Sequence, residues 1–335
     1  MSDNRAIDFV ILWVDGSDPE WLEEKSHFTK NVVKDASSSA SRFRDWDNLQ
    51  YWFRGVEKFA PWVNNIYFIT WGHLPSWLNT DHPKLKIINH KDYIPEKYLP
   101  TFNSNVIELN IHRIPELSEN FVLFNDDMFL INHVNDTDFF KDGKPCDEFV
   151  MNVVVPNYNM PIIGHTNLNN TSIINKYFKK KKVIKQNFSK IYRLSYGSGF
   201  VRNVALKIWP IFTGFYNPHL PLAHLKSTFE VLWQKETQML DETSSNKFRT
   251  YKDLNHWLMR YWNLCSGNFT VRKKHLGKMF TVGADNGALV EYIKNQKGKT
   301  ICINDSSSVP DFEASVKSVK EAFDCILPDK SAFEK

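Results

Sequence analysis

Two groups of acidic side chains follow apolar runs in the first half of the chain. Asn125-Asp126-Asp127 comes directly after one run, and Asp15-Gly16-Ser17 comes directly after another. Adjacent carboxylates are costly unless a cation or hydrogen-bond donors neutralise them. Hard oxygen ligands of this kind suit Mg²⁺ or Mn²⁺ holding a diphosphate. We predict a metal site at the first group and a nucleotide-binding turn at the second, although both sequences also occur in ordinary surface turns.

Three further positions carry groups that are suited to phosphate chemistry. Asn304 and Asp305 end another apolar run, far from the first two along the chain. His219 and His224 lie in a loop whose prolines fix the backbone, which helps a general base to hold its geometry. A structural role is more common for any one histidine. Arg249 precedes a predicted helix and could clamp a phosphate, or it could form a surface salt bridge.

The elements that must position these residues alternate between strands and helices. Apolar runs predict strands at residues 7–14, 65–71, 84–89 and 120–130. Apolar residues at spacings of three and four predict helices over residues 45–59 and 104–113, the second with Asn103 or Ser104 as its N-cap. This alternation predicts an α/β fold with a mostly parallel sheet flanked by helices. Since ligands gather at the carboxyl ends of parallel strands, Asp15 and Asp127 are expected at one edge.

The second half of the chain predicts a more helical arrangement. Residues 251–265 predict a helix with Gly267 as its cap, and residues 310–327 predict a final helix. A short apolar strand is expected at residues 300–303. Residues 172–193 are basic, which predicts an irregular, mobile segment.

Charge is distributed unevenly along the 335 residues. Eleven Lys or Arg and no Asp or Glu lie between Glu148 and Glu230, whereas the whole chain carries a net charge of only +4. Such a block favours contact with an anionic lipid surface or an anionic acceptor polymer, with a solvated loop as the alternative. Nucleic acid is not expected, because no binding motif of a known class is present. The polar N-terminus and the absence of a long apolar run predict a cytoplasmic protein.

Four ordered groups of motifs resemble the conserved regions of the Stealth family. The first is Ile7-Asp8-Phe9-Val10 with Trp13 to Pro19; the second is Phe43-Arg44-Asp45, residues 57–62, 99–104 and 112–115, and Asn125-Asp126-Asp127; the third is Pro218-His219-Leu220-Pro221 with residues 248–267; the fourth runs from Ile301 to Phe333. Together they span nearly the whole chain in the family's order. The resemblance implies a Rossmann-like, glycosyltransferase-A-like fold.

The resemblance also implies a reaction. Family members include bacterial capsule and cell-wall polysaccharide phosphotransferases and the catalytic subunit of the lysosomal-enzyme N-acetylglucosamine-1-phosphotransferase. A hydroxyl of a growing glycan, or of a lipid-linked oligosaccharide, would attack the β-phosphorus of a UDP-sugar, and UMP would leave. The expected product is a hexose-1-phosphate diester, and contact with the inner face of the cytoplasmic membrane is expected to be peripheral.

The resemblance assigns roles to particular residues. Mg²⁺ or Mn²⁺ would bind to Asp126, Asp127 and Asp305. His219, which lies in the family motif, would take the acceptor proton, and Arg249 would stabilise charge on the phosphate. The donor would be held by Asp15, Gly16, Ser17, Arg44, Asn103, Ser104, His112, Arg113 and Asn304.

This assignment divides the chain into three parts and leaves two alternatives open. Residues 1–150 would form the nucleotide-sugar-binding core, 151–247 a basic insertion facing the acceptor or membrane, and 248–335 a segment that completes the site. Ser306-Ser307-Ser308 stands where family members often carry more acidic residues. One alternative is an ordinary metal-dependent glycosyltransferase that releases UDP. The other is a non-catalytic surface-binding protein that uses the basic stretch.

Overall fold

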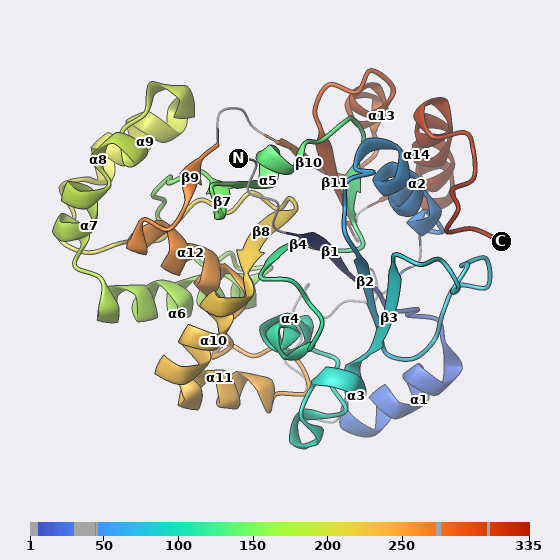
Figure 1. The fold of residues 1–335 in the computed structure, drawn as a ribbon, viewed down its shortest axis with the longest axis horizontal. Coiled ribbons are helices and arrows are strands. Elements are labelled where there is room, and N and C mark those ends of the chain that lie inside the picture. The colour runs from blue at the N-terminus through green and yellow to red at the C-terminus, as the bar shows by residue number, and fades with distance from the viewer. Residues whose placement is uncertain (1–5, 30–43, 45, 273–275, 307–308) are drawn as a thin grey trace.

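A computed structural model describes residues 6–29, 44, 46–272, 276–306 and 309–335 (Figure 1). Phe43, Asp45, Ser307 and Ser308, which belong to the motifs above, lie outside the described residues. A five-stranded sheet in the order β3-β2-β1-β4-β8 forms the centre. The strands are β1 (Ile7–Leu12), β2 (Ile66–Thr70), β3 (Leu85–Asn89), β4 (Asn120–Phe124) and β8 (Leu222–Leu225). The first four are parallel and β8 is antiparallel, which confirms the predicted α/β architecture.

The predicted strand over residues 120–130 is wrong, because two strands in different sheets replace it. β4 ends at Phe124, and a turn closed by the Met128 N–H and the Asn125 carbonyl, 3.1 Å apart, leads into β5 (Met128–Leu130). β5 pairs with β11 (Thr300–Asn304), which pairs with β10 (Gly277–Thr281). Asp127 therefore lies in a turn between two sheets.

Helices cover both faces of the central sheet, and each face has its own apolar core. On one face pack α2 (Leu49–Phe59), α13 (Gly287–Lys294) and α14 (Phe312–Ile326). On the other pack α4 (Ser104–Leu109), α10 (Lys226–Lys235) and α12 (Trp257–Ser266). The two groups of helices lie on opposite sides of the strands in Figure 1. Strands that are apolar along their whole length therefore face helices on both sides, as expected for a parallel sheet.

The remaining elements are short, apart from one long helix. They are α1 (Pro19–Phe28), α3 (His90–Tyr93), α5 (Asp136–Phe139), α6 (Pro161–Tyr177), α7 (Lys180–Gln186), α8 (Phe188–Ile191), α9 (Ser198–Leu206), α11 (Thr237–Ser244), β6 (Phe140–Lys141), β7 (Lys144–Asp147) and β9 (Thr270–Val271), with 3₁₀ turns at Glu96–Tyr98, Ile111–Arg113 and Leu194–Tyr196. Residues 172–193 are thus mostly helical, and the predicted irregular segment is wrong.

Three predicted helices are present with shorter bounds. The first begins at Leu49, and the second ends at Leu109 with Asn103 as its N-cap. The third begins at Trp257 rather than at residue 251, and Gly267 ends it at φ 77°, a left-handed conformation that glycine adopts without strain. The final helix also agrees with its prediction, since Asp311 caps its N-terminus.

Candidate active site

Three chemically active side chains meet beside the turn after β4. The Asp127 Oδ2 atom lies 3.3 Å from His219 Nε2 and 3.3 Å from Cys302 Sγ. Asp127 and His219 are half-buried, whereas Cys302 lies in β11 and is buried. We call these three residues the Asp127 cluster. A carboxylate in contact with an imidazole stabilises the positive charge that the ring gains when it takes a proton.

The turn after β1 lies at the same edge of the sheet, because β1 and β4 are adjacent parallel strands that end together. Asp15 Oδ1 accepts hydrogen bonds from the Ser17 N–H at 2.8 Å and from its hydroxyl at 2.6 Å, around Gly16. The Asp15 N–H donates to His73 Nε2 at 2.7 Å. The predicted nucleotide-binding turn is therefore ordered by its own side chains and shares an edge with the Asp127 cluster.

The first turn of α4 brings a phosphate-binding candidate to the same region. Arg249 Nη2 donates to Ser104 Oγ at 2.6 Å. Glu108, one turn further along α4, is buried, and burial raises the pKa of its carboxyl to about 7. The positive charges of Arg249 and His219 act against this rise. Both charges act on Glu108, so the predicted base and the predicted phosphate clamp share this carboxyl as an electrostatic neighbour.

Asn103, which is predicted to bind the donor, also has a structural role. Its Oδ1 atom accepts from the Asn105 N–H at 3.1 Å, and its Nδ2 donates to Asp253 Oδ2 at 2.8 Å. The buried Asp253 carboxylate also accepts from the Thr250 N–H and hydroxyl. This turn occupies residues 250–253, so α12 begins after it, and it carries Arg249 against the start of α4.

Asp305 is held by an arginine. Arg44 donates from Nε to Asp305 Oδ2 at 3.0 Å and from Nη2 to Oδ1 at 2.7 Å, while its guanidinium lies 3.7 Å from the centre of the Phe312 ring. Within the described part of the chain, the group of potential metal ligands consists of Asp127, His219 and Cys302, without Asp305. Arg44 therefore neutralises Asp305, and the metal-binding roles of Asp305 and the donor-binding role of Arg44 stay predictions.

Four other predicted site residues, Asp126, Asn304, His112 and Arg113, lie in different parts of the fold. Asp126 is exposed beside the Asp127 cluster, and Asn304 ends β11 opposite Thr281. The His112 ring and the Arg113 guanidinium pack on Trp233 of α10, at 5.8 Å and 4.6 Å. Burial lowers the pKa of His112 to about 4, so its ring is neutral at pH 7. The contacts of His112 and Arg113 thus tie the 3₁₀ turn to α10, and their predicted donor contacts are untested.

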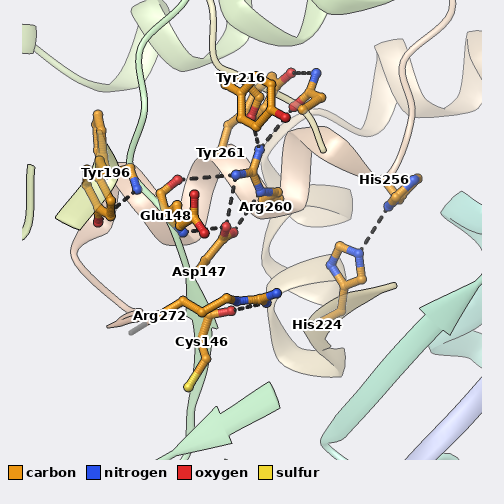
Figure 2. A network of polar contacts seen from close by, with 12 residues as sticks. Cys146, Asp147, Glu148, Tyr196, Tyr216, His224, His256, Arg260, Tyr261 and Arg272 are labelled. Carbon is orange, nitrogen blue, oxygen red and sulfur yellow. Dashed lines mark hydrogen bonds and ion pairs between the residues drawn. The ribbon is translucent and has the colours of Figure 1, made fainter. Parts of the chain in front are cut away.

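A buried ion pair holds the segment that leads to His219 (Figure 2). Arg260 of α12 donates to both carboxylate oxygens of Asp147, at 2.7 Å and 2.9 Å. Its Nη1 donates to the Tyr216 carbonyl at 2.8 Å and to Asn217 Oδ1 at 3.0 Å. Because Asn217 precedes Pro218 and His219 directly, this network fixes the approach of the predicted base to the Asp127 cluster.

The second histidine of the loop is buried in the sheet rather than exposed in the site. His224 lies in β8, and its Nε2 is 3.1 Å from Nδ1 of His256 (Figure 2). Burial lowers the pKa of His224 to about 3 and that of His256 well below its usual value. His256 Nε2 in turn lies 3.9 Å from Glu108. Both rings are neutral at pH 7, which suits a structural role for His224.

Sequence reasoning missed Cys302, Glu108 and Arg260. A signal existed for Cys302, because alternation along residues 300–304 places it on the face opposite Ile301 and Ile303. Glu108 is a carboxylate on the buried side of a short helix, next to Leu109. Arg260 stands among apolar residues of α12, and only the fold shows that Asp147 is its partner.

Known proteins resemble this chain along its full length. Two family models match: conserved region 1 of the Stealth proteins over residues 5–32, and conserved region 2 over residues 42–147. The capsular polysaccharide phosphotransferase WcwK of Streptococcus pneumoniae is 45% identical and covers 100% of both chains. The chain belongs to the Stealth family. The exopolysaccharide phosphotransferase cps2G of Lactiplantibacillus plantarum is 41% identical over 98% of this chain and 96% of its own.

The matched Stealth regions include part of the candidate site. Region 1 contains the Asp15 turn, and region 2 contains Arg44, Ser104, Glu108 and Asp127. A further relative, the receptor polysaccharide phosphotransferase WefC of Streptococcus gordonii, is 39% identical over 98% of this chain and 99% of its own. Across the described residues, none of the helices is long and apolar enough to span a membrane.

Proposed function

We propose that this Stealth protein transfers a hexose-1-phosphate from a UDP-sugar to a hydroxyl of a growing capsular or extracellular polysaccharide and releases UMP. The observation that carries the proposal is the contact of Asp127 with His219 at the carboxyl edge of a parallel sheet. Full-length relatives named as polysaccharide phosphotransferases support the same reaction class. The expected donor is a UDP-sugar, and the expected acceptor is a glycan or lipid-linked oligosaccharide.

In this reaction the acceptor oxygen attacks the β-phosphorus of the donor. A new P–O bond forms, the bond between the β-phosphorus and the bridging oxygen breaks, and the bridging oxygen leaves with UMP. His219 receives the acceptor proton, and Asp127 stabilises the resulting imidazolium. Arg249, held against Ser104, faces charge on the transferring phosphate. Phosphoryl transfer depends mainly on such positioning and charge neutralisation.

The side-chain atoms that could ligate a metal at this site fit a divalent cation in part. Mg²⁺ is held in proteins by one or two carboxylates together with substrate phosphates, which Asp127 and its neighbour Asp126 can supply. Such an ion would neutralise the diphosphate of the donor when bound. The sulfur of Cys302 and the nitrogen of His219 suit softer metals such as Zn²⁺ better than Mg²⁺. We therefore assign the expected Mg²⁺ or Mn²⁺ to Asp126 and Asp127, and leave His219 as the base.

The nucleotide that leaves distinguishes this proposal from ordinary glycosyl transfer. Purified protein is incubated with a panel of UDP-sugars and a glycan acceptor, and the nucleotides are separated by chromatography. Phosphotransfer releases UMP in step with product, whereas attack at the anomeric carbon releases UDP. UDP as the stoichiometric product would overturn the proposal in favour of the glycosyltransferase.

The place where the reaction occurs is also part of the proposal. A lipid-linked acceptor would require the enzyme to work at the inner face of the cytoplasmic membrane. The net positive block between Glu148 and Glu230 supports peripheral contact with anionic lipid there.

A further inference from the structure

An exposed apolar surface lies around α9, in a part of the molecule that the proposed reaction does not use. It consists of Leu194, Val201, Val204, Ile208, Trp209 and Ile211, which are between 48% and 81% exposed. We call it the α9 surface. Val201, Val204 and Ile208 recur at helical spacing, so they point to one side of α9 and its extension. α7, α8 and α9 lie together at one side of the molecule, away from the central sheet (Figure 1). Contiguous exposed apolar patches mark interaction sites.

Buried polar contacts fix the opposite side of α9. The Asn203 side chain donates to the carbonyls of Phe149 and Ile191, at 2.7 Å and 2.8 Å, and accepts from the Met151 N–H at 2.7 Å. Asn203 is buried completely. The helix is therefore anchored by its inner face, and its apolar residues are turned outward by the fold.

A buried lysine fixes the turn that follows α9. The Lys180 ammonium donates to the carbonyls of Leu206, Trp209 and Ile211, at 2.6 Å, 2.9 Å and 3.2 Å. A cation at the carboxyl end of a helix satisfies carbonyls that lack partners within the helix. These contacts hold the backbone of the turn, on which the side chains of Ile208, Trp209 and Ile211 are exposed.

The segments on either side of the α9 surface in the chain are rich in positive charge. Their exposed basic residues include Lys179, Lys181, Lys182, Lys185, Arg193 and Lys207. No Asp or Glu occurs between Glu148 and Glu230. Apolar side chains beside basic ones are what an anionic bilayer binds, since the former enter the acyl boundary and the latter meet the lipid phosphates. Trp is also enriched at membrane interfaces.

We propose that the α9 surface docks this protein on an anionic lipid bilayer. A second copy of the chain fits the surface less well, because a symmetric interface would bring the same positive groups together. A soluble anionic polymer would use the lysines but would leave the exposed aliphatic side chains in water. The lipid bilayer is the partner that uses both features.

The α9 surface is connected to the candidate site by a short stretch of backbone. Ile211 is followed by a segment that pairs with residues 152–154, where the Asn152 N–H donates to the Gly214 carbonyl at 3.0 Å. That segment continues into Asn217 and His219. Docking would thus bring the bilayer to the side of the molecule from which this segment leads to the base. The proposal deepens the membrane contact of the proposed function by naming the surface that makes it, and the use of a lipid-linked acceptor there rests on the proposed function.

Vesicle co-sedimentation of the full chain tests the docking. Vesicles of phosphatidylcholine alone are compared with vesicles in which a third of the lipid is phosphatidylglycerol. The apolar variant carries Ile208→Ser, Trp209→Ser and Ile211→Ser, and the charge variant carries Lys181→Gln, Lys182→Gln and Lys185→Gln. A matched control replaces exposed apolar residues elsewhere, with Leu22→Ser, Val231→Ser and Met279→Ser. Thermal melting checks that each variant is folded, and Trp209→Ser alone serves if the triple variant is not.

The wild type and the control are expected to bind to the anionic vesicles only. The apolar variant should bind at least tenfold more weakly, and the charge variant about fivefold more weakly for each charge removed. Docking is refuted if the apolar variant binds like the wild type. It is also refuted if the wild type binds a soluble anionic polysaccharide but no vesicle, or if the apolar variant instead dissociates a dimer in sedimentation velocity. Turnover of a small soluble acceptor should be equal in all variants, so a failure of the proposed reaction is seen separately.

Discussion

The Asp147–Arg260 ion pair allows a sharp test of how the fold positions His219. Asp147→Asn leaves the buried Arg260 guanidinium without its charge partner. Breaking a buried pair in this way costs about 3–5 kcal/mol of unfolding free energy. An unfolding entropy of about 2.1 cal/mol/K per residue gives about 0.7 kcal/mol/K for this chain of 335 residues, so Tm should fall by about 4–7 °C.

The same change should also slow catalysis, because Asp147 orients the Arg260 guanidinium that donates to Asn217, two residues before His219. Misplacing a catalytic group by about 1 Å can cost about 10²-fold in rate, and we expect kcat to fall by roughly 10- to 100-fold with little change in the Kd of the donor. The assays are differential scanning calorimetry and release of UMP at saturating donor.

A second ion pair in the molecule provides a matched control. Arg54 also binds to both oxygens of one carboxylate, that of Glu334, at 2.8 Å and 2.8 Å, on the far side of the central sheet. Glu334→Gln should lower Tm but leave kcat near that of the wild type. If Asp147→Asn and Glu334→Gln reduce kcat equally, Arg260 stabilises the fold without positioning His219, and the reasoning is refuted.

Three further predictions concern the site itself. His219→Ala should lower kcat by about 10²–10⁴-fold, while His133→Ala, at an exposed histidine, should leave it unchanged; equal activities would remove His219 from the mechanism. Burial raises the Glu108 pKa to about 7 in the folded state, so the folded protein keeps this carboxyl protonated and loses stability as the pH rises. The free energy of unfolding of the wild type should therefore fall by about 3 kcal/mol between pH 4.5 and 7, relative to that of Glu108→Gln. Matching pH profiles of Tm for the two proteins would contradict this. Chelation with EDTA should abolish turnover, and Mg²⁺ or Mn²⁺ should restore it, whereas Asp127→Asn should stay inactive with a near-normal Tm. Full activity in EDTA would contradict the metal role. Recovery with Zn²⁺ alone would favour Cys302 as a ligand.

The strands and the edge where Asp15 and Asp127 meet could be predicted, because both depend on local patterns. Apolar runs determine which segments are buried on two faces, and parallel neighbours must end at a common edge. The polar residues Asn125, Asp126 and Asp127 indicate where the first of the two strands ends, but local patterns do not show that the apolar residues after them join a different sheet. The partner of β5 is β11, which is distant along the chain.

The surroundings of individual site residues could not be read from local patterns. The pairing of the Asp305 carboxylate with Arg44 depends on how two distant loops fold together, and the predicted metal-binding role of Asp305 stays a prediction. The basic stretch at residues 172–193 was predicted to be irregular because lysines that follow one another closely in the chain repel one another. In the structure Lys180 is buried among carbonyls, and Lys190 donates to those of Gly267 and Phe269, so these charges are compensated by backbone dipoles.

The central claim is transfer of phosphate together with the sugar, and ³¹P NMR of the purified product tests it most directly. The product is made with the UDP-sugar that turns over, freed of nucleotides and treated with phosphomonoesterase before the spectrum is recorded. The account predicts one phosphodiester resonance for each sugar transferred, resistant to the phosphomonoesterase. A product that contains the transferred sugar but no phosphorus would contradict it.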